Sequence, residues 1–188
     1  MNQQEPDHKQ GTTFPTELSI RPATADDVPL ILAFIRELAE FERLTHEVIA
    51  TEDDLRRTLF GEHPHAEVII ASIADDPVGF ALFFHNYSTF LARPGLYVED
   101  LYVREAHRGR GVGRAMFTHL ARIARDRECG RLEWWVLDWN ERAIRFYETL
   151  GAQPMADWTV YRLGGEALAK MADDGGSEAA TPFGGAGR

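Results

Sequence analysis

The stretch "EDLYVREAHRGRGVGRAMF", residues 99–117, joins a β-rich run to an amphipathic run through a turn of alternating arginine and glycine. The turn consists of Arg108, Gly109, Arg110, Gly111, Val112, Gly113 and Arg114. A strand, a glycine-rich turn and a helix in this order present backbone N–H groups and the positive end of a helix dipole. Glycine lets the main chain approach a phosphate closely, and arginine adds charge-assisted hydrogen bonds. The stretch therefore predicts a site for a phosphorylated ligand.

Two common phosphate-binding patterns do not fit this turn. The glycines are not followed by Lys-Ser or Lys-Thr, which excludes the loop that binds nucleoside triphosphates. Counting from Gly109 places Arg114 where the dinucleotide fingerprint needs Gly or Ala. An RNA-binding Arg–Gly tract would be repeated, and this one is not. Taken alone, the stretch also fits a basic turn before a solvated helix start.

The composition limits the classes of protein to consider. The chain has 188 residues, 44% of them hydrophobic, which suits one compact domain with a core. It contains no apolar run of the roughly 18 residues that span a bilayer, and its first residues are too polar for a secretory signal. Thirty acidic against 20 basic residues give a formal net charge of −10, which argues against nucleic-acid binding. The acidic balance would suit a small cationic substrate.

Cysteine and histidine provide no metal site. Cys129 is the only cysteine, which excludes an internal disulfide and a thiolate zinc cluster and leads us to expect a reducing, cytoplasmic location. His63 and His65 flank Pro64, but no further ligand follows at a suitable spacing. We therefore expect no metal cofactor.

Hydrophobic periodicity predicts a mixed α/β domain. Strands are expected at 18–24, 66–74, 77–88, 95–103, 131–137 and 158–163. Helices are expected at 25–44, 51–60, 112 to about 129, 141–150 and 165–172. The order is β-α-α-β-β-β-α-β-α-β, which favours a mixed sheet with helices on its faces. The polar stretch 1–16 and the glycine-rich stretch 173–188 are expected to be disordered tails around one domain at 17–172.

The turn also matches a family signature. "RGRGVG" fits the Arg/Gln-x-x-Gly-x-Gly/Ala pattern of the Gcn5-related N-acetyltransferases (GNAT), with Arg108, Gly111 and Gly113 in the fixed positions. Further segments between about residues 20 and 171 resemble the diamine acetyltransferase branch, which includes spermidine/spermine and thialysine acetyltransferases. These segments are "RPATADD", "ELAEFE", "FGEHP", "VGFALFF", "YVEDLYV", "WNERAIRFYETLGA" and "YRL".

The resemblance implies a fold and a cosubstrate. The GNAT fold is a central, mostly antiparallel mixed sheet with a splayed parallel pair of strands and helices on both faces. Acetyl-CoA is the cosubstrate, and its pyrophosphate lies in the loop 108–114. The backbone of Leu101, Tyr102 and Val103 is expected to pair with the pantetheine arm as an added strand. Asn140, Glu141 and Ala143 are expected to lie along the coenzyme.

The resemblance also assigns the chemistry. Glu99 and Asp100 are adjacent on a strand, so their side chains point to opposite faces unless a bulge intervenes. The family has such a bulge, which implies that Glu99 binds the ammonium group and accepts its proton through water. Tyr147 inherits the role of proton donor to the departing thiolate. Because a phenol is a weaker acid than a thiol, this donation has to accompany cleavage of the C–S bond.

The amine substrate is less sharply defined. Glu42, Asp100, Glu133 and Trp135 match positions of the substrate pocket. Thr159 stands where the polyamine enzymes have an acidic residue, which favours shorter, ornithine-like or thialysine-like amines. The expected activity is direct transfer of acetyl from acetyl-CoA to a primary amine of a small polyamine, diamine or diamino acid. The family further implies a homodimer with pockets near the subunit interface.

Two alternatives stay open at this point. One is an acetyltransferase for protein lysines or for an antibiotic. The other is a non-enzymatic CoA-binding sensor, in which the loop would persist without turnover.

Overall fold

The structure is a computed structural model that describes residues 15 and 17–174. The expected tails at 1–16 and 173–188 lie almost entirely outside these residues, and Asp173 is the last residue of a helix. The backbone divides into two compact units between Leu137 and Asp138. The expected domain boundaries stay a prediction.

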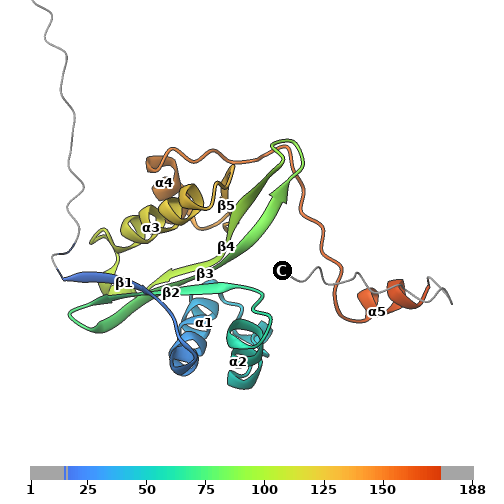
Figure 1. Ribbon diagram of the computed structural model, residues 1–188, viewed down its shortest axis with the longest axis horizontal. Coiled ribbons are helices and arrows are strands. Elements are labelled where there is room, and N and C mark those ends of the chain that lie inside the picture. The colour runs from blue at the N-terminus through green and yellow to red at the C-terminus, as the bar shows by residue number, and fades with distance from the viewer. Residues whose placement is uncertain (1–14, 16, 175–188) are drawn as a thin grey trace, which may run out of the picture. The chain divides into compact units, whose positions relative to one another are not determined.

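The first unit contains a five-stranded sheet with the order β1-β2-β3-β4-β5 (Figure 1). The strands are β1 (Leu18–Pro22), β2 (Glu67–Ile73), β3 (Asp76–Ser88), β4 (Arg93–Val103) and β5 (Leu132–Trp134). The first four pair antiparallel, and β5 pairs parallel to β4 over three residues. This confirms the mixed sheet with one parallel pair, although β5 is shorter than the expected strand at 131–137.

Helices cover both faces of this sheet, as expected (Figure 1). Helices α1 (Val28–Glu42) and α2 (Glu52–Phe60) pack on one face, and α3 (Val112–Asp126) packs on the other. Three short 3₁₀ turns occupy Ala25–Asp27, Thr45–Glu47 and Glu105–His107. Helix α3 ends three residues before the position near Cys129 that its sequence suggested.

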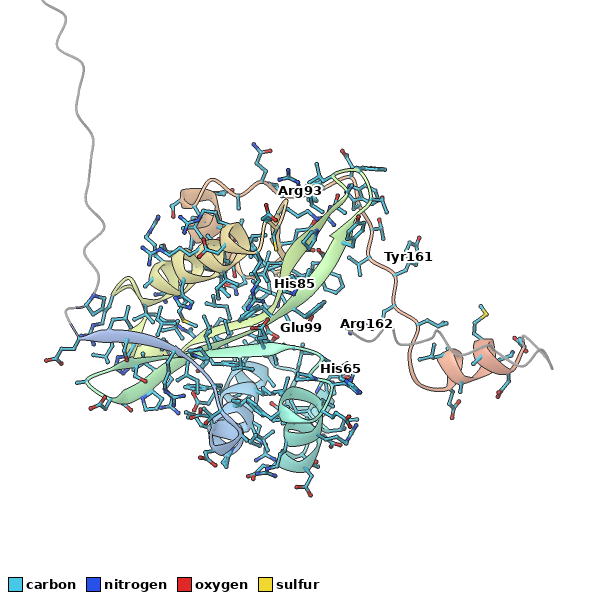
Figure 2. All side chains as sticks on the ribbon, viewed as in Figure 1. His65, His85, Arg93, Glu99, Tyr161 and Arg162 are labelled. Atoms are coloured by element: carbon cyan, nitrogen blue, oxygen red, sulfur yellow. The ribbon has the colours of Figure 1, made fainter. Side chains whose placement is uncertain are left out.

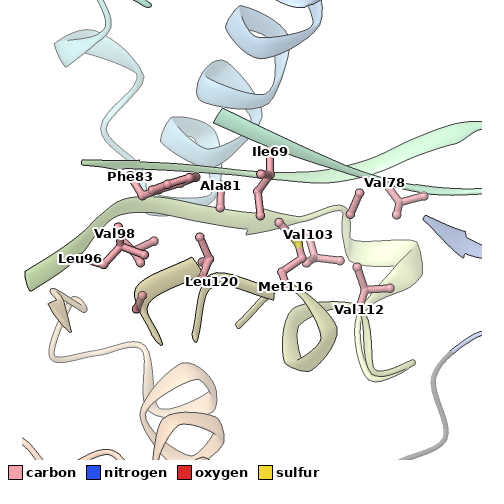
Figure 3. Packing of buried hydrophobic residues seen from close by; sticks show 12 residues of the cluster. Ile69, Val78, Ala81, Phe83, Leu96, Val98, Val103, Val112, Met116 and Leu120 are labelled. Carbon is pink, nitrogen blue, oxygen red and sulfur yellow. The ribbon is translucent and has the colours of Figure 1, made fainter. Parts of the chain in front are cut away.

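The core under α3 anchors the helix that follows the glycine-rich loop (Figure 3). Met116 and Leu120 of α3 are fully buried against Phe83 of β3 and Leu96 and Val98 of β4. Burying one such side chain stabilises the fold by about 1.5–3 kcal/mol. Val112, the first residue of α3, and Val103, the last residue of β4, belong to the same core cluster, so the loop is anchored at both of its ends.

A second core lies on the opposite face, under α1 and α2. The rings of Phe34 in α1 and Phe80 in β3 are stacked with their centroids 5.4 Å apart. Tyr102 of β4 belongs to the same cluster, and its ring centroid is 6.3 Å from that of Phe34. Helix α1 is thus fixed to the strand that carries the candidate catalytic acids.

Local sequence signals placed the turn and cap positions well. Ala74 and Asp75, with φ of 48° and 65°, form the two-residue turn between β2 and β3, and left-handed φ at both positions matches the twist of a hairpin. Thr51 caps α2, and its hydroxyl accepts a hydrogen bond of 3.2 Å from the Asp54 N–H.

The second unit contains α4 (Glu141–Thr149) and α5 (Gly165–Asp173). Asn140 caps α4, and Gly151 adopts φ of 84° just after the helix, both as expected. The strand expected at 158–163 was wrong, because these residues form no strand in the structure. Their alternating apolar side chains remain exposed, and the segment has no neighbouring strand among the described residues to complete a hydrogen-bonded ladder.

Among the described residues, no helix is both long enough and apolar enough to cross a membrane.

Candidate active site

A β-bulge interrupts β4 at the predicted catalytic acids. Phe83 of β3 pairs with Val98, and the preceding residue, Leu82, pairs with Asp100. Glu99 is therefore the extra residue of the bulge and has no partner on β3. The bulge implied by the family resemblance is confirmed.

The bulge decides which face of the sheet the acids occupy. Val98 packs in the core under α3, whereas Tyr102 packs in the core under α1. Residues four apart on a regular strand share a face, so the bulge between them reverses the alternation. Glu99 directly follows Val98 and therefore points to the opposite face, the α1 side. Asp100 lies two residues before Tyr102 and therefore shares its face, which is also the α1 side. Figure 2 labels Glu99 on this strand.

Two carboxylates, one from β4 and one from α1, act on the carboxyl group of Asp100. Burial raises the pKa of Asp100 to about 7, and the negative charges of Glu99 and then of Glu42 add to this effect. Burial also raises the pKa of Glu42, the last residue of α1. The structure thus brings together Glu42, Glu99 and Asp100, all predicted to contact the amine. Asp100 is the one whose pKa lies near neutrality, a property that the sequence did not reveal.

Aromatic rings extend the same face of the sheet. Phe84 of β3 and Tyr97 of β4 are paired across the strands, with ring centroids 5.2 Å apart. Tyr97 also meets the ring of Trp135 edge-on, with centroids 5.8 Å apart. Tyr97 lies two residues before Glu99, so the rings adjoin the acids. Trp135 was predicted for the pocket, whereas Phe84 and Tyr97 were missed.

Glu133 is engaged within the protein. One of its carboxylate oxygens accepts hydrogen bonds of 2.8 Å from Nε of Arg131 and of 2.8 Å from Nδ2 of Asn86. The contact with Asn86 ties β5 to β3, and the contact with Arg131 balances the charge of Glu133. Its predicted contact with the substrate stays a prediction.

The end of β4 presents an open edge. The pairing between β4 and β5 ends at Val98 and Trp134, where the bulge begins. Among the described residues, no strand pairs with Leu101, Tyr102 or Val103 on the side away from β3. An extended ligand could add to this edge as a strand does, which supports the predicted place of the pantetheine arm.

The glycine-rich loop has the expected backbone geometry. Gly109 and Gly111 adopt φ of 77° and 85°, in the left-handed region that favours glycine. Gly111 is the N-cap of α3, so the N–H groups of Val112 and Gly113 belong to the first turn of the helix. Such groups lack intrahelical acceptors and favour an anion. Arg110 is exposed, with Nη1 3.5 Å from Nδ1 of His107.

Arg108 differs from Arg110 because its side chain turns into the protein. Its Nε donates a hydrogen bond of 2.8 Å to the carbonyl of Val103. Its guanidinium carbon lies 4.4 Å from the ring centroid of Phe41 and 5.4 Å from that of Tyr102. Neither aromatic contact was predicted from the sequence, and Phe41 is far from Arg108 along the chain.

A second arginine of this region is also anchored to α1. Arg104 makes an ion pair with Glu37 at 2.8 Å and donates to the carbonyl of Pro77 at 2.8 Å. Its guanidinium carbon lies 4.8 Å from the ring centroid of Phe34. The spacing of Phe34, Glu37 and Phe41 on one helical face was the only sequence signal for these contacts, and it did not identify the partners.

The remaining predicted residues belong to the second unit. Tyr147 lies in α4, with its ring centroid 5.5 Å from that of Phe146. The Asn140 side chain accepts a hydrogen bond of 3.2 Å from the Ala143 N–H, and Glu141 pairs with Arg145 at 3.0 Å. The predicted donor role of Tyr147 and the coenzyme contacts of Asn140, Glu141 and Ala143 stay predictions.

No group of three or more His, Cys, Asp or Glu residues in the described part of the chain is arranged to hold a metal ion.

Comparison with known families places this site in a chemical context. The sequence model of the acetyltransferase (GNAT) family matches residues 32–152, which include the bulge, the loop and α4. The chain belongs to the GNAT acetyltransferase family. GNAT acetyltransferases use acetyl-CoA as cosubstrate, so the chain is an acetyl-CoA-dependent N-acetyltransferase.

Curated relatives agree with this assignment. The chain is 38% identical to the L-ornithine N5-acetyltransferase of Arabidopsis thaliana, over 79% of this chain and 85% of the relative. It is 39% identical to the thialysine N-epsilon-acetyltransferase of Bos taurus, over 81% of this chain and 96% of the relative. The solved structure of an integron cassette protein from V. cholerae superposes with a TM-score of 0.71 at 28% identity, covering 84% of this chain and 98% of that one.

Proposed function

We propose that this GNAT acetyltransferase acetylates a primary amine of a small diamine or diamino acid, and that Asp100 accepts the proton of the amine. The observation that carries the proposal is the bulge at Glu99, which turns two neighbouring carboxyl groups to one face beside Glu42. Three acids on one face favour a substrate with more than one positive charge. The names of the curated relatives, which include ornithine and thialysine enzymes, support the same class.

The acids have complementary tasks in the proposed reaction. A primary amine with a pKa of about 10 must lose a proton before it attacks, which costs about 4 kcal/mol at pH 7. A base works best when its pKa lies near the operating pH. Asp100, with a pKa of about 7, fits this requirement, so we assign proton acceptance to Asp100 in place of Glu99, to which the family resemblance assigned it. Glu99 is exposed at the bulge and would hold the ammonium group while it enters.

The aromatic rings fit the carbon chain of such a substrate. Ring faces attract cations and pack well against methylene or thioether groups. Tyr97 and Trp135 adjoin the acids, so they would hold the distal part of the amine while Glu99 holds its reacting end. The attack on the thioester then expels a thiolate, to which Tyr147 would donate a proton as the C–S bond breaks.

The decisive experiment is a panel of amines assayed by release of free thiol from acetyl-CoA. The panel should include ornithine, thialysine, lysine, 1,4-diaminobutane, spermidine, a monoamine of matched length, a lysine peptide and an aminoglycoside. We expect the highest kcat/KM for a diamine or diamino acid and a lower value for the matched monoamine. Preference for the peptide or the aminoglycoside would refute the proposed substrate class.

We also propose that two copies of the chain associate. Exposed apolar side chains support this, since Trp158 and Tyr161 are 70% and 92% exposed. Burial of such side chains against a second copy would be favourable. Sedimentation equilibrium should report twice the chain mass, and the double change Trp158→Ser, Tyr161→Ser should shift the mass toward one copy. A wild-type protein with the mass of one chain would refute the association. The cytoplasmic location suggested by the sequence stays a prediction.

A further inference from the structure

We propose that Arg108 is a positioning residue that locks the glycine-rich loop to helix α1, and that its guanidinium does not bind the coenzyme phosphates. The inference rests on the coenzyme-binding role of the loop. It changes the role expected for the first residue of the loop signature, which was direct charge contact with the diphosphate. It also assigns a function to Phe41, which lies outside the loop.

The hydrogen bond of Arg108 closes the corner between strand and loop. Nε of Arg108 donates to the carbonyl of Val103, the last residue of β4, at 2.8 Å. The Arg108 N–H donates to the carbonyl of Glu105 at 3.1 Å, which completes the intervening turn. Backbone and side chain of one residue therefore fix the corner from which the loop departs.

The guanidinium contacts place the charge beside aromatic rings. The rings of Phe41 from α1 and Tyr102 from β4 lie 4.4 Å and 5.4 Å from the guanidinium carbon. A guanidinium in this position gains cation–π attraction and covers apolar surface with its flat faces. Turning Arg108 outward to a phosphate would forfeit these contacts together with the bond to Val103. Arg110 is exposed in the same loop, and turning toward a phosphate would give up only its 3.5 Å contact with Nδ1 of His107.

This arrangement links the two substrates of the enzyme. Phe41 directly precedes Glu42, one of the three acids proposed to face the amine. Tyr102 lies two residues after Asp100 on β4. The Arg108 contact therefore joins the loop that holds the coenzyme to both elements that carry the amine-binding acids. Its function is to hold the coenzyme-binding loop in a fixed position relative to the face that carries the three acids.

A double-mutant cycle tests the inference. Calorimetry would measure the Kd of coenzyme A for wild type, Phe41→Leu, Arg108→Met and the double variant. Phe41→Leu removes the aromatic ring beside Arg108, so it should raise the Kd about two- to five-fold, the range expected of a partly exposed cation–π contact. Arg108→Met, which also removes the bond to Val103, should raise it about ten-fold. The double variant should bind about as weakly as Arg108→Met alone, because both changes break the same contact.

Charge and salt provide the second readout. A phosphate contact is screened by salt, so its removal should flatten the dependence of Kd on ionic strength. We expect Arg108→Met to keep the wild-type dependence and the matched variant Arg110→Met to flatten it. Arg108→Lys retains the charge but not the planar group, and it should bind as weakly as Arg108→Met. If Arg108→Met fails to fold, the Kd of coenzyme A for Arg108→Lys provides the same comparison.

Three results would overturn the inference: wild-type affinity in Phe41→Leu, additive effects in the double variant, or a flattened salt dependence in Arg108→Met. Phe41→Leu combined with Arg110→Met should by contrast be additive. A separate result would refute the proposed function: wild-type protein binds coenzyme A, but no diamine or diamino acid of the panel is acetylated.

Discussion

Asp100 on β4 and Glu42 at the end of α1 share one electrostatic environment, although 58 positions separate them in the sequence. Burial of Asp100 is the main reason that its pKa rises to about 7, and the charges of Glu99 and Glu42 add to the rise. A carboxyl group that titrates near neutrality suits proton transfer from an amine.

The first prediction concerns the pH dependence of catalysis. If Asp100 accepts the proton, kcat/KM should rise with pH through a limb centred near pH 7. Asp100→Asn should abolish this limb and lower kcat/KM by about 10²–10⁴-fold. The ionisation of the free amine lies near pH 10 and does not obscure the limb. A limb near pH 7 that survives in Asp100→Asn would assign the base to another group.

The second prediction concerns stability. Folding raises the pKa of Asp100 above the ordinary aspartate value, so the folded protein holds a proton that the unfolded chain has already released. Its contribution to stability is therefore full below about pH 4 and declines as the pH rises to about 7, by at most about 1.4 kcal/mol per pH unit. Urea unfolding at several pH values should show that Asp100→Asn removes this decline. An unchanged pH dependence would contradict the buried environment of Asp100.

The third prediction separates the effect of charge at Glu42 from that of its neighbours. Glu42→Gln removes a negative charge near Asp100, so the pKa of Asp100 should fall and the limb in kcat/KM should move to lower pH. The KM for a diamine should rise about two- to five-fold through loss of a partly exposed charge contact. Glu40→Gln, on the exposed side of the same helix, is the matched control and should change neither value. A limb that stays in place would show that Glu42 does not influence Asp100.

The fourth prediction concerns the leaving group. Tyr147→Phe removes only the hydroxyl, so turnover should fall about 10²-fold while the Kd of coenzyme A stays within two-fold of wild type. Tyr87→Phe, an exposed tyrosine of β3, provides the control. Steady-state thiol release and calorimetry measure the two quantities. Full activity of Tyr147→Phe across the pH range would disprove the assignment of Tyr147 as the proton donor.

The fifth prediction concerns the backbone of the loop. Gly111 adopts φ of 85°, and a β-branched residue there is strained by about 1–3 kcal/mol. Gly111→Val should therefore distort the start of α3 and weaken coenzyme A binding by at least about ten-fold. Gly164→Ala is the control, since Gly164 has a negative φ and an added Cβ would meet no atom within 4 Å. Wild-type affinity of Gly111→Val for coenzyme A would show that the loop amides do not bind the coenzyme.

The elements that depend on short-range signals were predicted closely from the sequence. The Thr51 cap of α2, the Asn140 cap of α4 and the glycine after α4 all lie where the sequence placed them. Caps and turns depend on bonds between residues a few positions apart, so the chain order alone identifies them. The expected strand at 158–163 failed for the opposite reason, since a strand needs a neighbour that alternation of side chains does not specify.

The sequence by itself determined the glycine-rich turn, the order of the elements from β1 to α4 and the presence of paired acids, because these depend on backbone preferences and on residue types. Only the tertiary structure decided that the bulge turns Glu99 and Asp100 to one face, and that burial holds the pKa of Asp100 near 7. It also decided that Arg108 points inward to Phe41 and that Glu133 is bound by Arg131 and Asn86. Burial and long-range contacts set these properties, and both arise from residues that are distant in sequence and meet only when the sheet and its helices pack.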